Sequence, residues 1–131
     1  MSKISISLLL ASLVVGVPTS SEAGPVTRGY VNDSFAIAVD SLNRMRVFAK
    51  ACGLSKTTEP VALEFMVGFS VKAGVSMSEV NKIVQDAYAS APEATGIPRD
   101  CDMKYVKFWT DAFRQNAREL DDVLTRYMLQ H

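Results

Sequence analysis

Apolar residues recur at helical spacing in four separate segments of the 131-residue chain, and this pattern constrains the fold more than any other feature. Steps of three and four residues place such side chains on one face of a helix. Glycines and prolines, which commonly end helices, separate the segments. The pattern predicts helices over residues 33–52, 59–73, 77–91 and 101–129. We therefore expect an all-α fold, a small antiparallel four-helix bundle.

The second predicted helix differs from the others because it is apolar nearly all round from Val61 to Phe69. A helix of this kind is normally buried, so we expect it at the centre of the fold. Gly68 lies inside it, where glycine costs about 1 kcal/mol relative to alanine. A close crossing with another helix would explain the glycine, and contact between a ligand and the backbone is the alternative explanation.

The first 23 residues match the pattern of a secretory signal peptide. Lys3 supplies the positive charge, residues 4–17 form an uncharged apolar run, and small residues precede the cleavage position at Ala23. A membrane anchor is the alternative, but a bilayer span takes about 20 apolar residues. We therefore expect cleavage after Ala23, which leaves residues 24–131 as one helical domain, without a membrane span, in the bacterial periplasm or secreted.

The charges of the predicted mature chain balance. Without Lys3 and Glu22, the chain has 13 basic and 13 acidic residues. Binding to a phosphate backbone needs an excess of positive charge, so the balance argues against nucleic-acid partners. Residues 24–58 carry a net positive charge and residues 59–98 a net negative charge. We interpret this asymmetry as attraction within one fold rather than as a field that steers a ligand.

The two cysteines, Cys52 and Cys101, are predicted to form a disulfide. An oxidising compartment favours the bond. Four helices that alternate in direction bring the end of the first and the start of the fourth to the same end of the bundle, which places both cysteines there. A redox site is the alternative, but redox cysteines commonly have only two residues between them, and these two are 49 positions apart.

The sequence argues against ordinary enzyme chemistry. The only histidine, His131, is the last residue, so a Ser-His or Cys-His nucleophile and the usual zinc sites are not expected. Motifs for calcium, haem attachment and phosphate loops are absent from the sequence. We expect no enzyme, no cofactor and no metal. A hydrolase using only carboxylates is the remaining alternative, although Asp121 and Asp122 look like groups on a helix surface.

The fourth predicted helix is longer than its neighbours, at about 43 Å against about 22–30 Å. Its far end therefore projects beyond them and exposes apolar residues, which usually marks a partner or dimer contact. The alternative is that the segment from Val26 to Tyr30 folds back over this end. The predicted partner-binding residues are Val123, Leu124, Tyr127 and Met128.

A second hypothesis places a small apolar ligand in a cavity between the helices. The candidate lining consists of large apolar and aromatic residues, which a filled core would also use: Phe65, Met66, Phe69, Tyr88, Trp109 and Phe113. The leading prediction is an exported, non-catalytic protein-binding module, such as an inhibitor, an immunity factor or a small chaperone, with another protein or a second copy of the chain as its partner. The alternative is a carrier of a small hydrophobic ligand.

Overall fold

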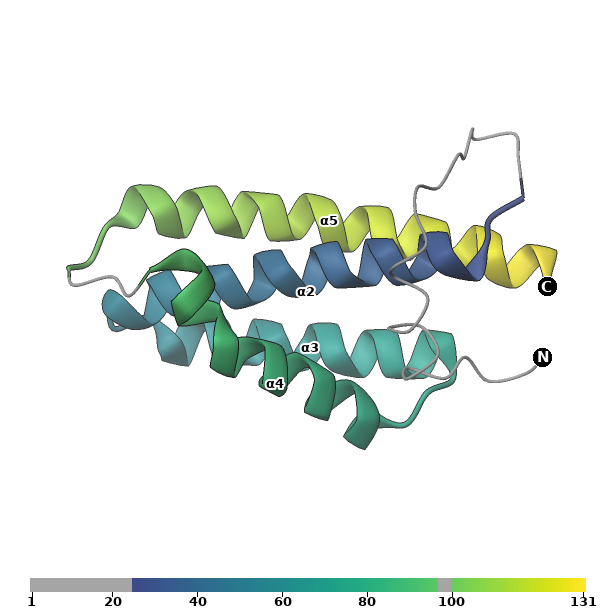
Figure 1. Ribbon diagram of the computed structural model, residues 1–131, viewed down its shortest axis with the longest axis horizontal. Helices are drawn as coiled ribbons and strands as arrows, with labels where there is room; N and C mark the ends of the chain where they lie inside the picture. The colour runs from purple at the N-terminus through teal and green to yellow at the C-terminus, as the bar shows by residue number, and fades with distance from the viewer. Residues whose placement is uncertain (1–24, 97–99) are drawn as a thin grey trace.

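The computed structural model describes residues 25–96 and 100–131, and in this part the chain is a bundle of four helices (Figure 1). The predicted signal peptide lies outside the described residues. The helices are α2 (Arg28–Ala51), α3 (Ser55–Ala73), α4 (Met77–Thr95) and α5 (Met103–Gln130). All elements of this part are helices, so the all-α expectation is confirmed. Each helix runs opposite to the one before it. None of these helices has the length and apolar character that a membrane crossing needs.

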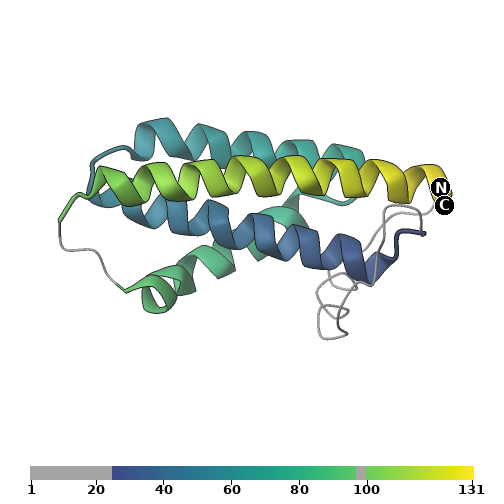
Figure 2. The same cartoon turned by 90° about the horizontal axis from the view of Figure 1, so that it is seen from above.

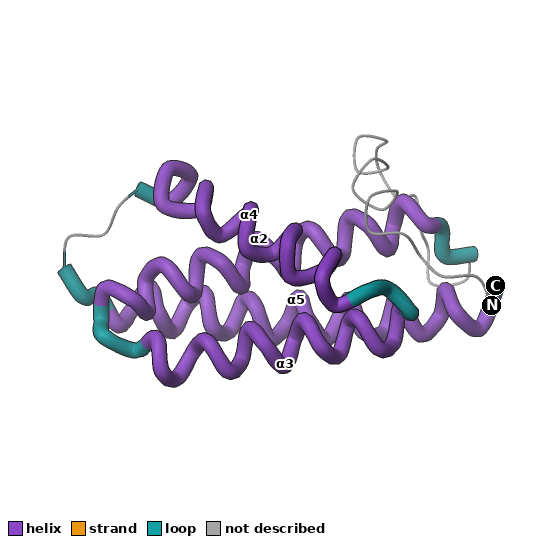
Figure 3. Tube along the Cα trace, turned by 90° about the horizontal axis from the view of Figure 1, so that it is seen from below, coloured by secondary structure: helices purple, strands orange, loops and turns teal. Residues whose placement is uncertain are grey.

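Helix α2 is the centre of the bundle, because it packs against all three other helices and most extensively against α5. Helix α4 packs against α2 and α3, and it crosses α2 at an angle (Figure 3). Seen from above, the C-terminal end of α4 lies away from α2 and α5 (Figure 2). The largest fully buried apolar side chains come mostly from α2 and from the far half of α5: Val26, Val31, Phe35, Leu42, Met45, Val80, Val84, Val123 and Leu124.

The expectation that the second helix would be central is wrong. Helix α3 lies at the periphery and buries one side, on which Phe69 packs against Phe35 of α2 with ring centroids 4.4 Å apart. Its other side is open, and Leu63, Val67 and Val71 are exposed there. Apolar character all round predicts burial, but it does not say how many neighbours a small domain can provide.

Three helices extend four or five residues beyond their predicted bounds. Helix α2 begins at Arg28 rather than at residue 33, because the Thr27 hydroxyl accepts a hydrogen bond from the Tyr30 N–H at 3.1 Å and caps the helix. Helix α3 begins at Ser55, which places Pro60 inside the helix rather than in its first turn. Helix α4 continues through Pro92 to Thr95. The fourth helix, α5, begins at Met103 instead of residue 101, after the Asp102 cap.

The turns between helices follow their local signals. Gly53 and Gly74 both have a φ of 70°, the left-handed conformation that favours glycine after a helix. The Ser76 hydroxyl accepts a hydrogen bond from the Glu79 N–H at 3.1 Å and so caps the start of α4. These turns are tight enough to make α2, α3 and α4 successive antiparallel neighbours.

Cys52 and Cys101 form a disulfide, as predicted, with their Cα atoms 4.5 Å apart. The bond joins the turn after α2 to the segment before α5, at the end of the bundle away from Val26 and Gln130 (Figure 1). It therefore holds together the two helices that share the largest interface, α2 and α5.

Arg46 of α2 ties α2, α3 and α4 together, although only 3% of its surface is exposed. Its Nε and Nη2 atoms donate to the two carboxylate oxygens of Glu59 in α3, at 2.9 and 2.7 Å. Nη2 also donates to Gln85 of α4 at 3.1 Å, and Nη1 donates to Asn43 at 3.1 Å. The guanidinium carbon lies 3.7 Å from the centre of the Tyr88 ring. A buried charge needs such partners, and here they come from every helix around it.

Removing the disulfide should destabilise the fold strongly. In the chain-entropy model, a closed loop of this length contributes about 4 kcal/mol. We expect the Cys52→Ala/Cys101→Ala variant to lose about that free energy of unfolding in urea titrations followed by circular dichroism. A loss below about 1 kcal/mol would show that α2 and α5 hold together without the bond.

Arg46 and Arg44 form a matched pair for testing the buried charge. Arg46→Ala should cost about 2–3 kcal/mol, because the charged hydrogen bonds and the packing on Tyr88 disappear while half-exposed Glu59 regains water. Arg44→Ala should cost under about 1 kcal/mol, because Arg44 pairs with exposed Asp40. Urea titrations measure both losses, and equal losses for the two variants would contradict a special role for Arg46.

Candidate functional site

The far end of α5 does not form the exposed apolar surface that the helix lengths predict. Val123 and Leu124 are each 1% exposed, while Tyr127 and Met128 are half-buried. The reason is the early start of α2, together with Val26, whose N–H donates to Gln130 Oε1 at 2.7 Å. The segment from Val26 to Tyr30 thus covers this end, which was the alternative interpretation. Whether a partner contacts these residues stays an untested prediction.

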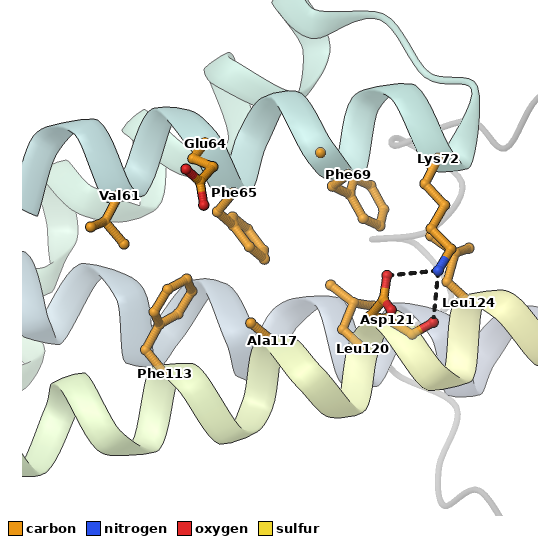
Figure 4. Close-up of a pocket in the computed structure, with 11 residues that line it drawn as sticks. Val61, Glu64, Phe65, Phe69, Lys72, Phe113, Ala117, Leu120, Asp121 and Leu124 are labelled. Atoms are coloured by element: carbon orange, nitrogen blue, oxygen red, sulfur yellow. Dashed lines mark hydrogen bonds and ion pairs between the residues drawn. The ribbon is translucent and has the colours of Figure 1, made fainter.

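The six residues proposed to line a ligand cavity fall into separate environments. Phe65, Phe69 and Phe113 line one pocket of about 230 Å³ between α3 and α5 (Figure 4). Met66 is buried in the core. Tyr88 lies against Arg46, and Trp109 lies 5.1 Å from the guanidinium carbon of Arg44. Only half of the predicted set therefore lines one pocket, although Met66 belongs to the same core and Trp109 packs against it.

The pocket between α3 and α5 is an apolar groove with charged groups at its edge (Figure 4). Its apolar lining includes Ala117, Leu120 and Leu124 of α5, the helix that also carries Phe113 and faces Phe65 and Phe69 of α3. At one end the Lys72 ammonium donates to Asp121 Oδ1 at 2.6 Å and to the Asp121 carbonyl at 3.2 Å. This contact holds α3 against α5, where the two helices otherwise have little packing.

The outer face of α3 continues this groove toward solvent. Val71 is 77% exposed, and Val61 also lies on the exposed side. Gly68 lies between them, and a Cβ added to it would meet no atom within 4 Å. The expected close crossing at Gly68 is therefore absent among the residues that the structure describes. The glycine is not needed for packing inside this part of the chain.

A second exposed surface lies at the disulfide end, where α2 and α5 pack side by side. We call it the aromatic seam: Arg44 and Phe48 of α2, with Tyr105, Phe108 and Trp109 of α5. Tyr105 stacks on Phe48 with ring centroids 5.1 Å apart. Phe108, which is 58% exposed, meets Trp109 edge to face at 5.0 Å. The seam stays open because α4 packs against α2 and α3 instead of covering α5.

Sequence reasoning missed the seam as a surface because Tyr105 and Trp109 fit the apolar stripe of the fourth helix. Phe108 offered a signal, since it lies off that stripe and directly after Lys107. A large aromatic residue off the buried stripe of an amphipathic helix is exposed unless a further element covers it. Here no helix of the described part covers it.

Charges beside the seam are paired on the surface. Lys107 donates to Asp111 at 2.8 Å, and this hydrogen bond lowers the pKa of the Asp111 carboxyl. Elsewhere, a hydrogen bond with Asp86 raises the pKa of Lys82, and partial burial raises the pKa of Asp33. These groups lie on different helices and do not share a cleft. Among the described residues, no three side chains of the metal-binding types are gathered into a candidate metal site.

Comparisons with known proteins give no indication of what these surfaces bind. No protein-family model matches the chain, and no match was found among curated proteins or among solved structures.

Leu124 and Leu129 provide a test of which part of the α5 terminus is buried. Leu124→Ala should cost about 2–5 kcal/mol, because it opens a cavity in the core. Leu129, which is 83% exposed, should tolerate alanine with a change within about 0.5 kcal/mol. Thermal and urea unfolding of the two variants would check this. Equal, small losses would show that the terminus is not packed as described.

Proposed function

We propose that the chain is an exported, non-catalytic protein-binding module that uses the aromatic seam to bind another protein. Its type is that of an inhibitor, an immunity factor or a small chaperone. The observation that carries the proposal is the exposure of Phe108 beside Tyr105, Trp109 and Arg44. The seam takes over the role that the sequence assigned to the far end of α5.

The composition of the seam supports a protein as its ligand. Tyrosine, tryptophan, phenylalanine and arginine are enriched where proteins bind one another, and the first two and arginine dominate binding energy. The rings also pack on one another, since Tyr105 stacks on Phe48 and Phe108 contacts Trp109. Side chains already held in place lose less conformational entropy on binding.

The Cys52–Cys101 disulfide supports action outside the cytosol. Structural disulfides form and persist in oxidising compartments, such as the bacterial periplasm or the extracellular space. Together with the signal-like sequence that ends at Ala23, the bond favours export. The mass of the protein recovered from its native compartment measures this directly, because cleavage after Ala23 and oxidation of both thiols each change it. An uncleaved or reduced protein would contradict export.

The carrier hypothesis has less support. Ligand pockets commonly enclose about 300–1,000 Å³. The groove between α3 and α5, which three of the predicted residues line, has a volume of about 230 Å³. A larger pocket of about 540 Å³ between α2 and α4 is lined by none of the six predicted residues. Phe65, Phe69 and Phe113 fill the walls of the groove, so a ligand there would have to be small and apolar. Native mass spectrometry of the purified protein separates the hypotheses, because a retained apolar molecule supports a carrier.

Site-specific cross-linking tests the seam. A photoreactive phenylalanine analogue at position 108 should capture one protein in the native compartment, since Phe108 is the most exposed ring of the seam. The same analogue at position 129, which is also exposed but far from the seam, is the matched control. Cross-links at both positions to the same set of proteins would indicate non-specific contact and contradict the proposal.

The captured partner should then bind the purified protein in calorimetry. Phe108→Ala should raise the dissociation constant at least about tenfold. This corresponds to a loss of roughly 1.4 kcal/mol of binding free energy, as expected for an interface anchor. Leu129→Ala, at the far end of α5 and outside both the seam and the outer face of α3, should leave the affinity unchanged. An unchanged affinity for Phe108→Ala would overturn the assignment of the seam.

A further inference from the structure

The outer face of α3 contains a glycine that the fold itself does not need. Gly68 is exposed in the middle of the helix, and nothing lies within 4 Å of where its Cβ would be. Alanine would fit there and favour the helix by about 1 kcal/mol. A glycine at such a position allows a second helix to come close to the backbone.

Two opposite charges flank Gly68 symmetrically. Glu64 precedes it by four residues and Lys72 follows it by four residues, so all three lie on one face of α3. Figure 4 shows Glu64 and Lys72 on the same side of the helix, along the groove. Among the described residues Glu64 forms no ion pair, whereas Lys72 pairs with Asp121.

We propose that two copies of the chain pair through α3, antiparallel, with the two-fold axis at Gly68. In this register each residue faces the residue equally far on the other side of Gly68 in the second copy. Glu64 then faces Lys72 of the second copy, and the reverse pair forms at the other end. The exposed Val71 faces Phe65 in the groove of the second copy.

A second copy fits this face better than an unrelated protein because the charges complement themselves. A two-fold interface uses one patch on both subunits, so the patch must match its own rotated image. Glu64, Gly68 and Lys72 meet that condition by spacing alone. The surrounding valines give the apolar character that is typical of homodimer interfaces. The Lys72 ammonium can keep its bonds to Asp121 and turn its remaining donor from Thr125 to Glu64.

The pairing does not depend on the proposed function, because it uses another side of the molecule. Arg44 of the seam and Arg46, which contacts α3, are two positions apart in α2 and so point about 160° apart, to nearly opposite sides of the helix. The two surfaces can therefore be disrupted separately.

Sedimentation equilibrium of the oxidised protein tests the dimer. We expect the wild-type protein to form a dimer whose fraction rises with concentration. Gly68→Leu should raise the dissociation constant of the dimer at least about tenfold, because leucine blocks the close approach of the two helices. The fold should tolerate leucine because the space around Gly68 is open. Phe108→Ser is the control and should dimerise normally. A wild-type protein that stays monomeric up to about 1 mM would overturn the proposal, as would a Gly68→Leu dimer of unchanged affinity.

Charge exchange tests the register. Glu64→Lys alone and Lys72→Glu alone should each dimerise at least about tenfold more weakly, because like charges then meet at both ends of the interface. A mixture of the two variants should form a heterodimer, in which both pairs are again opposite in charge. Unfolding curves show whether Lys72→Glu still folds without its contact to Asp121. Failure of two folded variants to pair in the mixture would overturn the register.

Discussion

The buried guanidinium of Arg46 is the interaction on which the arrangement of the other helices depends. Desolvating this charge is costly, and hydrogen bonds and an opposite charge offset the cost. Glu59 supplies a bidentate contact from α3, and Gln85 and Tyr88 supply contacts from α4. These partners cannot reach Arg46 unless α3 and α4 lie on the same side of α2. The polar contact thus selects one packing among several that apolar surfaces alone would permit.

The position of α4 decides which surfaces stay open. Because α4 reaches Arg46 and also accepts a hydrogen bond from Asn43 at its Val84 carbonyl, it lies across α2 and away from α5. In a regular bundle the fourth neighbour would cover the free side of α5. Here that side carries Phe108 and Tyr105, which remain exposed at the disulfide end. The internal requirement of one buried charge therefore accounts for an external aromatic surface.

The elements that depend on local spacing could be predicted from the sequence, and those that depend on combinations of helices could not. The four helices and the Cys52–Cys101 bond follow from periodicity and from alternating helix directions. Helical spacing places Arg46 four residues after Leu42, on the buried stripe of α2, and places Arg44 on the other side of the helix. The partners of Arg46, namely Glu59, Gln85 and Tyr88, converge from two other helices, and no local signal in the sequence indicates that convergence. The early start of α2 depends on the Thr27 cap. The sequence did not indicate this start, because Gly29 lies in the first turn and glycine disfavours a helix. The apolar character of α3 predicted burial all round, but only one of its sides packs against other helices, and Leu63, Val67 and Val71 are exposed on the other.

The two open surfaces have different chemistry, and this difference favours different partners. The outer face of α3 is mostly aliphatic, carries the opposite charges of Glu64 and Lys72, and matches its own rotated image, whereas the seam is aromatic and has no such symmetry. Because α3 and the seam lie on opposite sides of α2, a dimer built on α3 leaves both seams exposed and presents two identical binding surfaces. Two linked sites bind a divalent or clustered target more tightly than one, since the second contact forms at a high effective concentration. The dimer would thus strengthen partner binding without any new contact at the seam, and only when the target can reach both seams at once.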